Sequence, residues 1–298
     1  MIQHICIVSP SGVIDPSHIE GACARLCTWG YKVSKGAHAR DTWGRFAGKD
    51  EDRLADLIDA LRDEEVDAIL CSRGGYGLQR IIDRIPKITK PIIGFSDITA
   101  LHQLCALSGQ PSVHGLMCKH IATLPEESEP IQAFRKALTG EPQEFSWEPH
   151  PLNREGEAEG ILAGGNLSVL YGLQGTEYGL KAIMNNKPIL LIEDIGERHY
   201  HIDRMIRNLR ISGVLANLSG LIVGQFTDCE DDPLMNCSIY ETIKEAVADY
   251  DYPVLFDAPF GHVDTNMPIW FGKPAKISYF LSRLSRGAGT PYLRAGLS

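Results

Sequence analysis

The chain of 298 residues has no apolar run near the roughly 20 residues that a membrane-spanning helix needs. Its first eight residues lack the basic region and the long apolar core of a secretory signal peptide, so they are predicted to form a β-strand. Positive charge is also scarce, since 29 Lys and Arg stand against 38 Asp and Glu, a formal net charge of -9. Phosphate binding needs clustered Lys and Arg. We therefore expect a cytoplasmic protein that binds neither nucleic acid nor a membrane.

Motifs for metal, nucleotide and disulfide chemistry are missing too. There is no CxxC or HExxH motif, and His199-x-His201 lies in a segment expected to be helical, so no metal site is predicted. The glycine-rich segment 73–77 has neither the Lys-Ser/Thr of a P-loop nor GxGxxG spacing, so no nucleotide cofactor is indicated. The eight cysteines are expected to be reduced thiols: Cys6, Cys23, Cys27, Cys71, Cys105, Cys118, Cys229 and Cys237.

Short apolar strands alternate with amphipathic helices in the first half of the chain. Strands are expected at 5–8, 31–33, 66–71 and 91–93, and helices at 18–29, 50–64, 78–85 and from 98. This alternation predicts an α/β fold with a doubly wound, mainly parallel sheet. Ligands bind outside the carboxyl ends of the strands in such sheets. The turn 9–12, the loop 72–77 and Ser96 each follow a strand and are therefore expected to converge.

A second domain is expected after a polar, proline-rich segment at 141–158, which we interpret as a linker. The predicted domains are therefore 1–140 and 159–298. In the second, strands are expected at 188–192, 218–223 and 253–255, with helices at 201–209 and 239–248.

Ser96 follows a predicted strand and precedes a predicted helix, within Gly94-Phe95-Ser96-Asp97. A serine at such a strand–turn–helix junction is typical of a nucleophile elbow, in which the N–H of the next residue helps to bind an oxyanion. The match to G-x-S-x-G is incomplete, because Ile98 replaces the second glycine. The alternative is that Ser96 or Asp97 caps the helix.

A serine nucleophile needs a base, usually histidine, and an acid that orients it. His262 is a candidate base, because it lies in a loop after the predicted strand at 253–255. The alternative is a solvated loop histidine.

Two acids, Glu193 and Asp194, directly follow a buried strand, and Glu197 is a third candidate. Charged side chains are rarely buried without partners, so packing does not account for the first two. They could also cap the next turn or pair with Arg198 or Arg204.

Two glycine-rich segments remain open to more than one interpretation. The N–H groups of Arg73-Gly74-Gly75-Tyr76-Gly77 could form an anion nest. Gly164-Gly165-Asn166 could form a tight turn or contact a substrate.

Seven segments occur in a fixed order along nearly the whole chain: Ser9-Pro10-Ser11-Gly12, Ser72-Arg73-Gly74-Gly75-Tyr76-Gly77, Gly94-Phe95-Ser96-Asp97-Ile98-Thr99-Ala100-Leu101, His114-Gly115, Gly164-Gly165-Asn166-Leu167, Leu191-Ile192-Glu193-Asp194-Ile195-Gly196-Glu197 and Phe260-Gly261-His262. With these segments the chain resembles the LD-carboxypeptidases, serine peptidases that include muramoyltetrapeptide carboxypeptidase and the microcin immunity peptidase. The resemblance implies a flavodoxin- or amidotransferase-like N-terminal sheet joined to a smaller C-terminal α/β swivelling domain.

The resemblance also implies a catalytic triad. Ser96 takes the nucleophile position, His262 that of the base and Glu193 that of the acid, with Glu197 as the alternative acid. Serine would come from the first domain, and the other two residues from the second.

The same resemblance suggests how a substrate would be held. The oxyanion would bind the N–H of Asp97 and one from Gly74 or Gly75, and Arg73 would pair with the terminal carboxylate of the substrate. Leu116 stands where relatives often have proline, which affects fine specificity only.

The implied reaction cleaves the amide between an L-centre diamino acid and the terminal D-alanine of a murein tetrapeptide, through an acyl-enzyme and with no cofactor. One alternative is a microcin-immunity-type peptidase that acts on peptide–nucleotide conjugates. The other is a non-catalytic module that binds a small peptide. A homodimer is common in the family.

Overall fold

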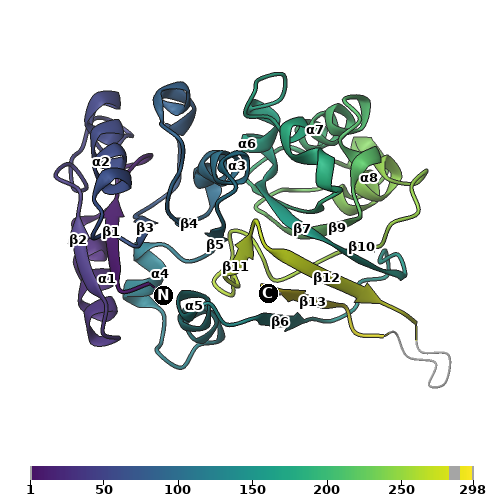
Figure 1. Cartoon of the computed structure of the whole chain (residues 1–298). Coiled ribbons are helices and arrows are strands. Elements are labelled where there is room, and N and C mark those ends of the chain that lie inside the picture. The colour runs from purple at the N-terminus through teal and green to yellow at the C-terminus, as the bar shows by residue number, and fades with distance from the viewer. Residues whose placement is uncertain (1, 282–288, 297–298) are drawn as a thin grey trace. The chain divides into compact units, whose positions relative to one another are not determined.

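A computed structural model describes residues 2–281 and 289–296, except for the side chain of Asn186. The chain divides into two compact units (Figure 1). The N-terminal unit comprises Met1–Glu141 and Asp264–Gly272, and the C-terminal unit comprises Pro142–Val263 and Lys273–Ser298. A short segment late in the chain therefore belongs to the N-terminal unit.

The N-terminal unit is built on a six-stranded sheet in the order β11-β5-β4-β3-β1-β2. Neighbouring strands are parallel except β11, which pairs with β5 in the antiparallel sense. The order β2-β1-β3-β4-β5 is that of flavodoxin-like sheets, whose ligands bind at the β1/β3 switch point. The strands are β1 (His4–Val8), β2 (Lys32–Lys35), β3 (Ala68–Cys71), β4 (Ile92–Gly94), β5 (Ser112–His114) and β11 (Ile269–Phe271).

Helices cover both faces of this sheet. They are α1 (Pro16–Thr28), α2 (Asp50–Arg62), α3 (Thr99–Ser108), α4 (Cys118–Thr123) and α5 (Glu129–Thr139), with the 3₁₀ turns η1 (Leu78–Arg80), η2 (Ile82–Arg84) and η3 (Ser96–Ile98). The expected helix at 78–85 is wrong, because Ile81 has φ −129° and interrupts it, leaving η1 and η2.

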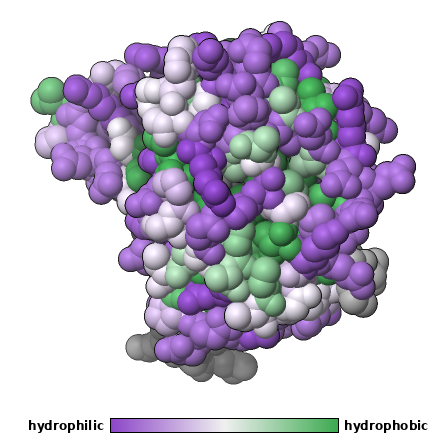
Figure 2. All heavy atoms as spheres, turned by 90° about the vertical axis from the view of Figure 1, so that its left-hand side faces the viewer, coloured by the Kyte–Doolittle hydropathy of each residue, from purple (hydrophilic) through white to green (hydrophobic). Residues whose placement is uncertain are grey.

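Strands β1, β3 and β4 are buried along their whole length, which is why they appear in the sequence as apolar runs, whereas the edge strand β2 is partly exposed. One face packs against α1, α4 and α5 in a single core. Its members include Ile5, Ile7, Leu26, Leu70, Ile93, Ile121 and Phe134, all fully or almost fully buried. Figure 2 shows that the surface on the β2 side is mostly hydrophilic, with smaller apolar areas between polar residues.

The C-terminal unit contains a seven-stranded sheet in the order β10-β9-β8-β7-β12-β13-β6. The pairs from β10 to β7 are parallel, and those from β7 to β6 are antiparallel. The strands are β6 (Gln143–Ser146), β7 (Gly156–Asn166), β8 (Ile189–Ile195), β9 (Gly220–Thr227), β10 (Val254–Leu255), β12 (Pro274–Tyr279) and β13 (Tyr292–Ala295). The segment predicted as a linker, 141–158, contains β6 and the first residues of β7.

Three helices of this unit pack on β8 and β9. The helices and 3₁₀ turns are α6 (Leu167–Gly172), α7 (His199–Ile211), α8 (Ile239–Ala246), η4 (Leu180–Asn186), η5 (Leu215–Asn217) and η6 (Pro233–Met235). The apolar stripe of α7, made of Ile202, Met205, Ile206 and Leu209, is buried in this core as its spacing predicts. None of the described helices is long and apolar enough to cross a membrane. All eight cysteines, each within the described residues, are free thiols in this structure.

Candidate active site

The segments after β1, β3 and β4 meet at the carboxyl ends of the strands, which confirms the predicted convergence. Ser9 Oγ lies 2.6 Å from Ser72 Oγ, and the N–H of Gly12 donates to the carbonyl of Gly74 at 3.0 Å. A Cβ atom on Gly74 would lie 2.6 Å from the Cβ of Ser96, so this glycine packs directly against the candidate nucleophile.

Ser96 lies at a strained turn between β4 and the helical segment η3–α3. It has φ +68°, in the left-handed region that L-residues other than Asn and Asp rarely adopt. Such strain persists only where the surrounding structure imposes it, and it clusters at functional sites. The local geometry is therefore that of a nucleophile elbow.

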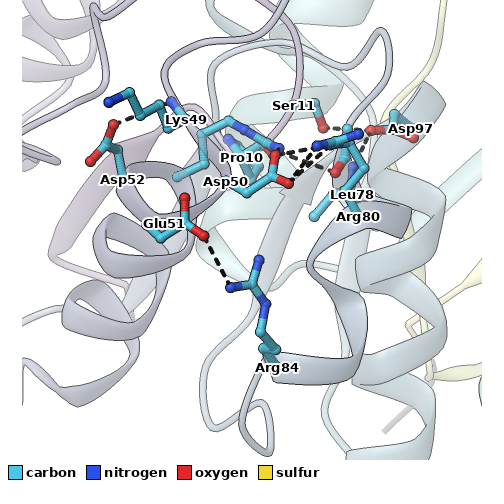
Figure 3. A network of polar contacts seen from close by, with 12 residues as sticks. Pro10, Ser11, Lys49, Asp50, Glu51, Asp52, Leu78, Arg80, Arg84 and Asp97 are labelled. Atoms are coloured by element: carbon cyan, nitrogen blue, oxygen red, sulfur yellow. Dashed lines mark hydrogen bonds and ion pairs between the residues drawn. The ribbon is translucent and has the colours of Figure 1, made fainter.

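Helix capping does not account for Ser96 or Asp97. The N-cap residues of η3 and α3 are Phe95 and Ile98, and neither makes a side-chain capping bond. The Asp97 carboxylate instead accepts bonds from Ser11 Oγ at 2.7 Å and from the N–H of Leu78 at 3.0 Å (Figure 3). Asp97, the residue that follows Ser96, is thereby hydrogen-bonded to the segments after β1 and β3.

Burial raises the pKa of Asp97 above its usual value. The bonds from Leu78 and Ser11 and the charge of Arg53 act in the opposite direction. The buried carboxyl group is therefore supported by three neighbours from other parts of the sequence.

Arg73 and Gly75 occupy the exposed part of the glycine-rich loop. Gly75 has φ +101°, which glycine adopts without strain. The Arg73 guanidinium donates through Nη1 to the carbonyl of Val13 at 2.6 Å. An arginine has five N–H donors, so this bond leaves capacity for a ligand carboxylate.

Glu193 and His262 form a hydrogen-bonded pair within the C-terminal unit. Nδ1 of His262 lies 2.7 Å from Oε2 of Glu193, whose side chain is fully buried. Because a carboxylate only accepts, Nδ1 carries the proton, and in a neutral ring the basic lone pair is then on Nε2. This is the tautomer that a general base next to a serine requires.

The pair exists because two glycines let the loop after β10 approach β8 and β9. A Cβ atom on Gly224 of β9 would lie 2.4 Å from the carbonyl oxygen of Phe260. Gly261 has φ +133°, and its Cβ would lie 3.2 Å from Oε2 of Glu193. The N–H of Gln225 then donates to the carbonyl of Phe260 at 2.9 Å, which fixes the loop beside His262.

The pKa of His262 is raised above its ordinary value. Burial is the largest single influence and lowers the pKa, but the hydrogen bond and charge of Glu193, with the charge of Asp194, outweigh it. Glu193 therefore both orients the ring and stabilises its protonated form.

The other two candidate acids have different partners. Oε2 of Glu197 lies 3.0 Å from Nδ1 of His201, one helical turn away. Asp194 accepts from the side-chain amide of Asn166 at 2.9 Å and from the N–H of Ser168 at 2.8 Å. Burial, and next the charge of Glu193, raise the pKa of Asp194 to about 7.

The glycine-rich segment at 164–166 has a packing role. A Cβ atom on Gly164 would lie only 1.8 Å from the carbonyl oxygen of Leu191, so β7 and β8 can pair here only without a side chain. Asn166 caps α6 by accepting from the N–H of Val169 at 3.1 Å.

Histidines that could have bound a metal have other bonds. Nε2 of His199 lies 2.8 Å from Thr242 Oγ1, while His201 pairs with Glu197. Within the described residues, one group that brings three potential ligand atoms within 4.8 Å of one another is His38, Asp41 and Asp52.

Comparisons with known proteins cover both halves of the chain. Residues 5–115 match the model of the LD-carboxypeptidase N-terminal domain, and residues 159–277 match that of the LD-carboxypeptidase C-terminal domain. A Bacillus subtilis protein named "Probable murein peptide carboxypeptidase" is 33% identical over 91% of this chain and 88% of its own.

Solved structures share the fold. Muramoyltetrapeptide carboxypeptidase from Oxalobacter formigenes superposes with a TM-score of 0.84 and 26% identity, over 99% of both chains. MccF in complex with glutamyl sulfamoyl guanosine superposes with a TM-score of 0.81 and 18% identity, over 99% of this chain and 96% of the other.

These matches, together with the α/β fold in two units, define a serine-type peptidase, a hydrolase. The chain belongs to the LD-carboxypeptidase family.

Sequence reasoning missed the residues that support Ser96 and His262 from a distance. Ser11 bonds to Asp97 across 86 positions, and Gly224 makes room for the His262 loop from another strand. The signals in the sequence are weak: a serine in the turn after β1, and a glycine in the middle of β9 after the apolar residues 221–223.

Proposed function

We propose that the protein is a serine LD-carboxypeptidase that removes the terminal D-alanine from murein tetrapeptides. The proposed triad is Ser96 as nucleophile, His262 as base and Glu193 as the acid that orients it. The observation that carries the proposal is the 2.7 Å bond between Glu193 and His262 Nδ1, which leaves Nε2 as the basic atom. A module that only binds peptides has no need for such a pair.

In the proposed reaction, His262 Nε2 takes the proton of Ser96 Oγ as the oxygen attacks the carbonyl of the diamino acid. The tetrahedral intermediate collapses as His262 protonates the leaving amine of D-alanine, which breaks the amide bond. Water, deprotonated by His262, then hydrolyses the acyl-enzyme and restores Ser96. The residues of this chain supply all the proton transfers.

The N–H groups of Asp97 and Gly75 are the proposed oxyanion donors. Asp97 follows the nucleophile, where an elbow places its first donor. The carbonyl of Gly74 accepts a hydrogen bond from the N–H of Gly12. Across the trans peptide bond between Gly74 and Gly75, the N–H of Gly75 points in the direction opposite to the carbonyl of Gly74. The N–H of Gly75 therefore points away from Gly12, which favours Gly75 over Gly74. Arg73 is the proposed partner of the substrate's terminal carboxylate.

Four further properties are part of the proposal. The substrate is a small peptide or muropeptide, and the protein acts in the cytoplasm, where its eight free thiols would stay reduced. We also propose a homodimer, which sedimentation equilibrium would test. The fourth property is a pair of separate domains, which is supported by the boundary between the two compact units at 141/142, near the predicted linker, although Asp264–Gly272 joins the N-terminal unit.

Mass spectrometry of the products from L-Ala-γ-D-Glu-diamino acid-D-Ala tests the function. The wild type should release one D-alanine, and Ser96→Ala should lower kcat on the order of 10⁴-fold or more, because triad residues act as a unit. Near-normal turnover by Ser96→Ala would remove Ser96 from the mechanism.

The same assay with a peptide–nucleotide conjugate as substrate tests the alternative, a microcin-immunity-type peptidase. The shared fold with MccF motivates this arm. Cleavage of the conjugate but not the tetrapeptide would replace the proposed substrate. If folded wild type cleaves neither, a peptide-binding module becomes the better interpretation.

A further inference from the structure

Arg53 is the largest fully buried polar side chain of the N-terminal unit. It belongs to α2, yet only 1% of the residue is exposed. Arginine is almost never buried without partners, because removing its charge from water is costly. Its partners therefore indicate what the residue holds in place.

The guanidinium of Arg53 bonds to two loop carbonyls and to one carboxylate. Nη1 donates to the carbonyl of Pro10 and, at 3.2 Å, to that of Gly77. Nη2 donates to Oδ1 of Asp50 at 2.5 Å. The group also lies 5.3 Å from the centre of the Phe46 ring, within cation–π range.

Asp50 is itself held from a second side. Nε of Arg80 donates to both of its carboxylate oxygens at 3.0 Å (Figure 3). Arg80 lies in η1, directly after the glycine-rich loop. Two arginines therefore share one carboxylate, which joins the start of α2 to the end of this loop.

The two carbonyls belong to the segments that surround Ser96. Pro10 is in the turn after β1, next to Ser11, which bonds to Asp97. Gly77 ends the loop that begins with Gly74 against Ser96. The close approach of the loop is built in, since a Cβ atom on Gly77, with φ +147°, would lie 2.8 Å from Nη1 of Arg53.

We propose that Arg53 is a positioning residue for the reaction, which fixes the turn after β1 and the glycine-rich loop in the arrangement that Ser96 and its oxyanion donors require. This inference rests on the proposed role of Ser96. Arg53 acts through backbone carbonyls and Asp97, not by contact with substrate. Burial raises the pKa of the Asp97 carboxyl group, and the charge of Arg53 is one of the smaller influences that oppose this rise.

Lysine would not replace Arg53 in this position. The planar guanidinium directs separate N–H groups to two carbonyls and one carboxylate at once. An ammonium keeps the charge but is a compact point donor on a flexible stem. Arg53→Lys therefore separates the geometric function of the residue from its charge.

The test compares Arg53→Lys and Arg53→Met with Arg84→Ala, a matched control. Arg84 of η2 forms an ion pair at 3.5 Å with Glu51, which lies on α2, the helix that also carries Arg53 (Figure 3). The side chain of Arg84 is 41% exposed. For each variant, kcat and KM for the tetrapeptide, the rate of Ser96 acylation by a serine-directed reagent, and Tm are measured. Only variants that are folded at the assay temperature are compared.

We expect Arg53→Lys to lower kcat and the acylation rate by about tenfold to 100-fold, with KM within about threefold, because a small displacement of catalytic groups costs that much rate. Arg53→Met should lose at least as much where it folds, and Arg84→Ala should match the wild type. A purely structural role would lower Tm but leave kcat of the folded variant unchanged.

Different results would contradict the positioning role of Arg53 and the role of Ser96 as nucleophile. If folded Arg53→Lys keeps kcat within about twofold of wild type while Ser96→Ala is inactive, the positioning role is wrong and the triad stands. If Ser96→Ala is as active as the wild type, the proposed nucleophile is wrong and the role of Arg53 falls with it.

Discussion

Gly74 and Ser96 are packed so closely that no side chain fits between them: a Cβ atom on Gly74 would lie 2.6 Å from the Cβ of Ser96 and 2.9 Å from its Oγ. Real Cβ atoms do not approach other atoms to such distances, so any larger residue must displace the serine or the loop. The glycine at this position is therefore tied to the placement of the Ser96 hydroxyl.

Gly74→Ala is expected to lower kcat by about 100-fold while the protein stays folded, because a displacement of about 1 Å in a catalytic group costs that much rate. Gly44→Ala is the control, since nothing lies within 4 Å of its Cβ position, although its φ of +62° strains alanine. The control should lose about 1 kcal/mol of stability and keep its kcat. Equal kcat values for both variants, measured on the tetrapeptide, would show that the contact with Ser96 does not matter.

The parts of the candidate site that follow one another in sequence could be predicted. The apolar run before Gly94 and the helical segment after Ile98 define the turn at Ser96, because β4, the turn and α3 are adjacent in the chain. Parallel strands then place the turns after β1 and β3 at the same edge of the sheet.

Long-range pairing could not be predicted in the same way. β6 pairs with β13, and β12 pairs with β7, between segments more than 100 positions apart, while β6 lies in a polar segment that resembles a linker. The register of such strands is set by the partner strand as well as by local sequence. The hydrogen bond from Ser11 to Asp97 likewise forms only once the sheet has brought the segments after β1 and β4 together.

Glu193→Gln tests whether His262 needs a carboxylate that fixes its tautomer, or only a polar partner of similar size. A glutamine amide can turn its N–H₂ towards the ring and favour the wrong tautomer, so kcat should fall by roughly 10³- to 10⁴-fold. Glu197→Gln, which removes a carboxylate bonded to His201, should leave kcat close to that of the wild type. The reverse order of effects would make Glu197 the acid of the triad.

The pH profile of kcat/KM reports the same pair. His262 must be neutral to act as a base, and Glu193 raises its pKa, so activity should rise with pH through a value above the ordinary histidine pKa. In Glu193→Gln, burial still lowers the pKa of His262, while the hydrogen bond and charge of Glu193 that raise it are lost and only the charge of Asp194 still opposes burial. The acid limb of the residual activity should therefore move to lower pH, and a limb that stays in place would show that another group is being titrated.

Gly164→Ala tests the pairing of β7 with β8. The new Cβ would lie 1.8 Å from the carbonyl oxygen of Leu191, at a φ of +135°. We expect a loss of about 3 kcal/mol or more in the free energy of unfolding, measured with urea, because the strands must separate. Gly175→Ala, with φ +82° and nothing within 4 Å, should cost about 1 kcal/mol from backbone strain alone. Similar losses in the two variants would contradict the close approach.

Asp194→Asn tests how a buried carboxyl group changes stability with pH. Burial and the charge of Glu193 raise the folded-state pKa of Asp194 from 3.8 to about 7. Between these two values the folded protein binds the proton more tightly than the unfolded chain does, so this group lowers stability as pH rises from about 4 to about 7. The asparagine variant has no such titration. The Tm of the wild type should therefore exceed that of Asp194→Asn by more at pH 5 than at pH 8, as measured by circular dichroism in buffers of equal ionic strength. A gap that widens towards pH 8 would mean that Asp194 is stabilised as the anion, by its bonds from Asn166 and Ser168.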